Sequence, residues 1–170
     1  VSFIDKFLLY IVKDTETDET RVTKLASLQM TLPNLIIDQT KIEVKSMADI
    51  IKNVFLKLEE SLIDRDKIQK YNEEIVEAEE KLDLYEKEIY DSNFSLLSKS
   101  LSQNLIEDTR MNLLACDEYE TIGDYQNRIA NRLYMIFENS IELDEKRKTM
   151  LFKLHSLTVE LFSDISKGTE

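Results

Sequence analysis

The sequence predicts an all-α protein, an elongated antiparallel bundle of three or four helices. Turn-forming residues are scarce, because the 170 residues include only two glycines and one proline. Few turns imply long elements, which favours helices over the mixture of helix and strand in an average domain. Apolar residues also recur every three or four positions, as they do on the buried face of a helix.

The first helix is predicted to begin after a polar break. The acidic stretch DTETDET, 14–20, indicates a linker. Thr31, followed by Leu32 and Pro33, predicts the helix start, since proline in a first turn loses no hydrogen bond. From there apolar residues continue at helical spacing over 32–64.

Three further helices are predicted, over 66–98, 102–140 and 143–166, the last capped by Asp144. In the second helix an unbroken apolar seam is formed by Ile68, Tyr71, Ile75, Ala78, Leu82, Tyr85 and Ile89. In the third, the residues expected to point inward are Leu113, Ala115, Tyr119, Ile122, Ile129, Leu133 and Ile136. In the fourth, the expected apolar stripe is Leu151, Leu154, Thr158, Leu161 and Ile165.

The domain organisation follows from these helices. We expect a lead-in segment at 1–31, a helical bundle at 32–166 and a C-terminal tail at 167–170. No run of apolar residues is long enough to cross a membrane.

Charge and composition disfavour several classes of function. The net charge is −12, from 34 acidic and 22 basic residues, so nucleic acid is not an expected partner. One cysteine excludes an intrachain disulfide, and a single histidine leaves no Cys/His zinc pattern. Phe152, not glutamate, stands three residues before His155, so the di-iron bundle motif is absent. We therefore expect no catalytic residues and no enzyme.

Acidic residues accompany the apolar seams of the second and third helices. Glu79 and Asp83 are four residues apart, as are Glu120 and Asp124, so each pair shares one helix face. A solvated acidic surface is the simplest interpretation. Two such pairs on neighbouring antiparallel helices could instead form an oxygen-lined cage for Mg, Ca, Mn or Fe. Gly123, in mid-helix, indicates close backbone approach or room for a bulky group. Spacing alone leaves both interpretations open.

Three segments resemble a known family. YETIGDYQNRIA, 119–130, resembles the signature helix of PhoU-type domains, and EAEEKLDLYEKEI, 77–89, resembles the partner motif of that family. LASLQMTLPNLIIDQTKIEVKSMADI resembles the stretch that enters the PhoU-like region of bacterial Na/Pi-cotransporter-type membrane proteins. The resemblance covers residues 22–165.

The resemblance implies a three-helix repeat whose paired acidic motifs bind metal ions. Glu79 and Asp83 match the first motif, and Glu120 and Asp124 match the second. The expected cofactor is a divalent or transition metal ion, namely Mg, Mn, Fe or Zn. No other cofactor is expected.

The resemblance also implies a function in phosphate transport. The chain would be a regulatory or interaction domain of a sodium/phosphate-cotransporter-like protein, on the cytoplasmic face of the cell membrane. Its partner would be the membrane domain of its own transporter. Separately from the resemblance, we expect that the apolar opening segment could contact another copy in a homo-oligomer. The opening VSFIDKFLLYIVK, 1–13, would then be juxtamembrane, whereas its apolar pattern alone fits an ordinary amphipathic helix. The alternatives are a soluble PhoU-type regulator of phosphate signalling and a helical adaptor without metal.

Overall fold

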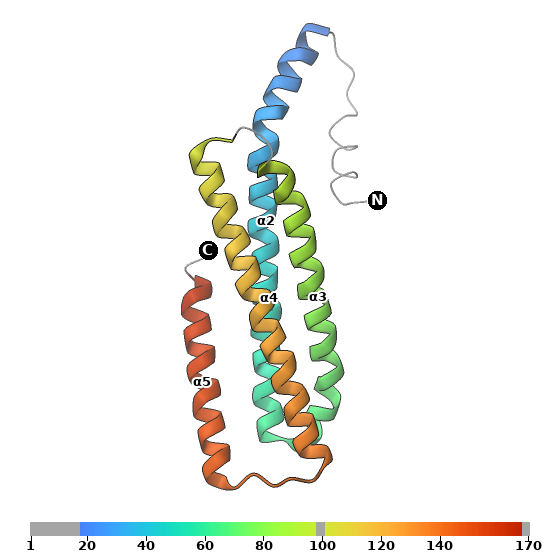
Figure 1. Cartoon of the computed structure of the whole chain (residues 1–170), viewed down its shortest axis with the longest axis vertical. Helices are drawn as coiled ribbons and strands as arrows, with labels where there is room; N and C mark the ends of the chain where they lie inside the picture. Colours follow the sequence, from blue (N-terminus) through green and yellow to red (C-terminus); the bar gives the residue numbers. More distant parts are fainter. Residues whose placement is uncertain (1–17, 98–100, 168–170) are drawn as a thin grey trace. The chain divides into compact units, whose positions relative to one another are not determined.

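The computed structural model describes residues 18–97 and 101–167. Within these ranges the chain forms four α-helices and no strand (Figure 1). The helices are α2, Asp18–Ile63, α3, Arg65–Leu97, α4, Gln103–Glu138, and α5, Glu145–Lys167. The predicted all-α bundle is confirmed, and the predicted ends of α3, α4 and α5 lie within two residues of those observed.

The predicted start of the first helix is wrong. Helix α2 begins at Asp18, so Pro33 lies inside it and Thr31 does not cap it. Strong helix formers, including Leu25 and Ala26, then lead into Pro33. A long helix with such flanks can accommodate the one hydrogen bond that proline removes.

The chain divides into two compact units between Leu35 and Ile36. Of the first unit, the structure describes only the helical residues 18–35. The second unit holds the bundle, in which the rest of α2 and helices α3, α4 and α5 alternate in direction (Figure 1). The predicted juxtamembrane opening lies outside the described residues, as does most of the predicted tail.

The core of the bundle forms two apolar clusters. The first lies between all four helices and contains Val44, Met47, Ala48, Ile51, Phe55, Leu82, Ile89, Cys116, Tyr119 and Phe162. The second contains Val54, Leu58, Ile68, Ile75, Ala78, Ala130 and Leu133. Of the seven seam positions predicted on α3, five are buried in these two clusters. The other two, Tyr71 and Tyr85, are partly buried and pack against the clusters from outside.

Helix α4 is rotated relative to the predicted inward face. Its buried residues are Thr109, Asn112, Cys116, Tyr119, Gly123, Gln126, Ala130 and Leu133. Only Tyr119 and Leu133 were expected among them, and the expected Ile129 is 51% exposed. The reason is that α4 inserts small and amide side chains at its buried face, where the most apolar residues of its sequence would not fit.

Buried amides join α4 to α2. Asn112 Nδ2 donates to the backbone oxygen of Ile37 at 3.4 Å, and Gln126 Nε2 donates to that of Ile51 at 3.0 Å. Both pairs are separated by 75 residues in sequence. This constant offset over two heptads shows that α2 and α4 run parallel, in one register.

Helix α5 is also rotated relative to prediction. Phe162 is its main buried residue, and its ring lies 5.6 Å from the rings of Phe55 and Tyr119. The expected stripe residues Leu154 and Leu161 are instead exposed. Aromatic packing sets this rotation, because Phe162 fills the space between α2 and α4. The predicted cap is confirmed, since the Arg147 amide donates to Asp144 Oδ1 at 2.8 Å.

Candidate functional site

The two acidic lines lie beside the buried positions of α3 and α4. On α3, the acids follow directly after seam residues, as Asp83 follows Leu82. On α4 the same holds, as Glu120 follows Tyr119 and Asp124 follows Gly123. Because the helices are antiparallel, equivalent flanking positions face each other along one edge of the interface. We call this edge the acidic seam; it comprises Glu79, Asp83, Glu86, Asp117, Glu120, Asp124 and Asn127.

Gly123 allows α3 and α4 to approach closely beside the acidic seam. A Cβ atom at position 123 would overlap Cδ1 of Leu82, a buried side chain on α3. The side chain of Leu82 thus occupies the room left by the missing Cβ, which is the second of the two interpretations of Gly123. The contact brings Asp83 and Asp124, the residues that follow Leu82 and Gly123, to the same level of the interface.

One direct hydrogen bond crosses the acidic seam. Asn127 Nδ2 donates to Glu79 Oε1 at 3.2 Å, and Asn131 Nδ2 donates to Asn127 Oδ1 at 2.9 Å. The two amides thus form a chain that ends on the Glu79 carboxylate. Glu79 is one of the four predicted metal ligands, and in the structure its carboxylate accepts a hydrogen bond from the neutral amide of Asn127.

Arg128 partly neutralises Asp124. Its guanidinium lies 2.7 Å from Asp124 Oδ2, one helical turn along α4, and also lies over the ring of Tyr125 at 5.5 Å. The pair is solvent-exposed, so it contributes little to stability. It does place a cation beside a predicted metal ligand. This contact was not predicted from the sequence, although the i, i+4 spacing of Asp124 and Arg128 could have indicated it.

Mutual repulsion is strongest around Glu120 and Glu86. Burial raises the pKa of Glu120, and the charges of Glu86, Asp124, Asp83 and Asp117 raise it further. Burial likewise raises the pKa of Glu86, followed by the charges of Asp117 and Asp83. Glu86 and Asp117 are therefore part of the same electrostatic site, although neither is among the four predicted ligands.

The structure brings the four predicted ligands to one edge without closing them into a cage. Asp83, Glu120 and Asp124 interact electrostatically, whereas Glu79 is held by Asn127. Within residues 18–97 and 101–167, no three His, Cys, Asp or Glu side chains are arranged to hold a metal ion. The donor chemistry fits a hard divalent cation, since carboxylates dominate. Metal binding stays a prediction, and it would require side chains to rotate toward each other.

Two other titratable residues do not form a reactive site. Cys116 is fully buried, and burial followed by nearby acids raises its pKa to about 12, so its thiol is not activated. His155 packs edge-on against Phe55 at 5.8 Å between ring centres. Burial lowers the pKa of His155, which favours its neutral form.

The helical bundle and the acidic seam together define a domain built on two opposed acidic motifs. The PhoU domain family matches residues 44–133, a segment that includes all of α3 and both acidic motifs. The match spans more than half of the 170 residues, and the chain belongs to the PhoU domain family. This confirms the resemblance to PhoU-type domains that the two acidic motifs predicted. The family is regulatory rather than catalytic.

No curated protein and no solved structure matches the chain. In the part of the chain that the structure describes, no helix combines the length and apolar character needed to span a membrane.

Proposed function

We propose that this chain is a regulatory domain of a sodium/phosphate-cotransporter-like membrane protein. Membership of the PhoU family supports a role in regulating phosphate transport. The segment that leads into the bundle supports the cotransporter context, because it resembles the corresponding stretch of those proteins. The domain lies at the cytoplasmic face of the membrane, contacts the membrane domain of its own transporter, and catalyses no reaction.

The acidic seam is the observation on which the regulatory proposal rests. Seven polar residues of two helices form one edge, and the pKa values of Glu86 and Glu120 are raised there. Such repulsion destabilises the folded chain, and a bound cation or proton would relieve it. A seam of this kind changes its charge state when a cation or proton arrives, which makes it a suitable sensor.

A divalent cation is the ligand that the acidic seam fits best. Glu79, Asp83, Glu120 and Asp124 would hold it, as Mg, Mn, Fe or Zn. When bound, the cation would supply positive charge that offsets the repulsion. Asn127 would have to release Glu79, and Arg128 would compete for Asp124. Both residues therefore tune the affinity of the site.

Cation binding is tested by thermal unfolding. We expect the wild type to melt at a higher temperature with Mg, Mn, Fe or Zn than with chelator. The gain is about 2.7 kcal/mol at a hundredfold excess of ligand over Kd. Asp124→Ala should abolish that gain, whereas Glu80→Gln, an exposed acid outside the seam, should retain it. A wild type that gains nothing from any of these metals contradicts cation binding.

Regulation of transport is tested in cells that carry the intact gene. We expect Asp83→Asn and Glu120→Gln to alter sodium-dependent uptake of radiolabelled phosphate, with Glu80→Gln as the control. Unchanged uptake in both seam variants would contradict the proposal. A gene product that lacks hydrophobic spans but still alters phosphate signalling would favour the soluble PhoU-type regulator instead.

A further inference from the structure

One face of α5 is apolar and open to solvent. Its exposed residues are Met150 (63%), Leu154 (63%), Leu157 (54%) and Leu161 (62%). They recur at spacings of four, three and four residues, so they form one stripe along the helix. Phe162 occupies a different face and packs on the bundle. Contiguous exposed apolar surface of this kind marks an interaction site.

Helix α4 also carries exposed apolar residues. Ile122 packs against the cluster that contains Phe162. Tyr125 and Ile129 follow Ile122 by three and seven residues, so they lie on the same side of α4, and both are more than half exposed.

A charged residue lies at each end of the apolar stripe, and the two residues carry opposite charges. Arg147 precedes Met150 by three residues, and Asp164 follows Leu161 by three. The full line, here called the α5 stripe, is Arg147, Met150, Leu154, Leu157, Leu161 and Asp164. Its spacings are three, four, three, four and three, the pattern of an a/d seam. It begins with a cation, ends with an anion, and is apolar between them.

The α5 stripe is complementary to itself when reversed. If a second α5 runs antiparallel about a two-fold axis between positions 155 and 156, Arg147 meets Asp164. In the same register Met150 meets Leu161, and Leu154 meets Leu157. Every pair then forms twice, as an isologous interface requires.

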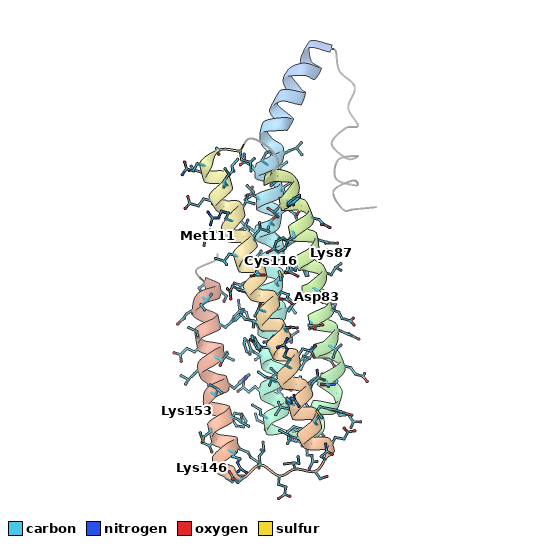
Figure 2. All side chains as sticks on the ribbon, viewed as in Figure 1. Asp83, Lys87, Met111, Cys116, Lys146 and Lys153 are labelled. Carbon is cyan, nitrogen blue, oxygen red and sulfur yellow. The ribbon has the colours of Figure 1, made fainter. Side chains whose placement is uncertain are left out.

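The charged residues that flank the stripe on one side are also complementary under the same two-fold symmetry. Lys153 and Glu160 are seven residues apart, on one side of the stripe. In the antiparallel register the Lys153 of each copy faces the Glu160 of the other. Among the ion pairs of the described residues, none involves either side chain. Figure 2 shows Lys153 on the outer side of α5, where such a partner could reach it.

We propose that a second copy of this chain covers the α5 stripe as an antiparallel two-fold dimer. Arg147, Lys153, Glu160 and Asp164 favour this partner over an anionic membrane, because a lipid surface would attract the first two and repel the others. The net charge of the chain, −12, also disfavours approach to an anionic membrane. Association through the α5 stripe requires neither phosphate transport nor cation binding, so its tests are independent of theirs.

The first test measures the mass of the full chain in solution. Sedimentation equilibrium at concentrations up to about 100 μM should show a dimer for the wild type. Leu157→Asp should weaken the dimer about tenfold or more, because this residue lies near the two-fold axis. Leu84→Asp is the matched control, since Leu84 on α3 is 55% exposed and lies outside the stripe. Circular dichroism should show that both variants are folded.

The second test exchanges charges on the flank. Lys153→Glu and Glu160→Lys each place like charges opposite one another, so each should weaken the homodimer. The double variant restores opposite charges and should regain the wild-type Kd. Mixing the two single variants should yield a heterodimer, in which both facing pairs are again opposite.

Three results would overturn the proposal. The first is a wild type that stays monomeric throughout the concentration range. The second is a dimer whose Kd is unchanged by Leu157→Asp or by the charge exchange, which would place the interface elsewhere. The third is a monomer that binds phosphatidylserine vesicles and loses this binding with Leu157→Asp, which would assign the stripe to a membrane.

Discussion

Gln126 on α4 donates a hydrogen bond of 3.0 Å to the backbone oxygen of Ile51 on α2. The glutamine side chain is 2% exposed, at a position where a bundle normally places an aliphatic residue. A buried polar group with a specific partner favours one alignment of two helices over others. Gln126 therefore helps to select the parallel register of α2 and α4.

Replacing Gln126 should separate its packing role from its polar role. Gln126→Ala leaves a cavity and removes the bond to Ile51, so it should lower the free energy of unfolding by about 2–3 kcal/mol. Gln126→Leu keeps most of the volume and should cost less than about 1.5 kcal/mol. Urea unfolding measures both values. Equal losses in the two variants would show that packing volume is not what the position supplies.

Adding one methyl group at Gly123 should be unfavourable. Gly123→Ala gains about 1 kcal/mol of helix propensity but forces its Cβ onto Leu82. Overpacking of this kind costs about 1–3 kcal/mol, so we expect a net loss of about 1 kcal/mol. Thr121→Ala, at an exposed position of the same helix, is the control. In combination with Leu82→Val the loss should shrink, and strictly additive effects would contradict direct contact.

Acidification should relieve repulsion in the acidic seam. The pKa of Glu120 is raised in the folded protein, so the folded state binds its proton more tightly than the unfolded state does. This group therefore adds stability as the pH falls through its folded-state pKa toward the ordinary value of about 4.5. Glu120→Gln should stabilise the protein near pH 7 and reduce the stability change between pH 7 and pH 5.

The control for the pH experiment is Glu118→Gln, which changes an exposed acid on α4. Its urea midpoint should follow the wild type at both pH values. If the urea midpoint of Glu120→Gln also equals that of the wild type at both pH values, the acids of the seam do not repel each other appreciably in solution.

The thiol of Cys116 should report opening of the bundle. It is fully buried and its pKa is raised to about 12, so a thiol reagent at pH 8 should leave the native protein unmodified. In urea the reaction should run to completion. Rapid labelling without denaturant, followed by mass spectrometry, would show that the core around α4 opens readily.

Nucleic acid should not bind. The chain carries a net charge of −12, so the phosphate backbone of DNA or RNA is repelled. At micromolar protein and physiological salt we expect no shift in a gel. A shift that weakens as salt is added would contradict this expectation.

Sequence alone was sufficient for the features that depend on local periodicity. The 3-4 spacing of α3 predicted its buried residues, from Ile68 to Ile89, because one helix face was apolar throughout. The sequence also predicted that Glu79 and Asp83 share one helix face and that Glu120 and Asp124 share another. Residues four apart lie on the same face of a helix, whichever element packs against it. Scarce glycine and proline predicted the helical class for the same local reason.

Tertiary structure decided which faces of α4 and α5 are buried. Both helices have apolar residues on more than one side, so hydrophobicity could not choose between them. On α4 the close approach at Gly123 and the bond of Gln126 to Ile51 select a face of small and amide residues, and leave Ile129 outside. On α5 the fit of Phe162 between Phe55 and Tyr119 turns Leu154 and Leu161 to solvent. Shape complementarity between helices, a property of pairs of elements, made these choices.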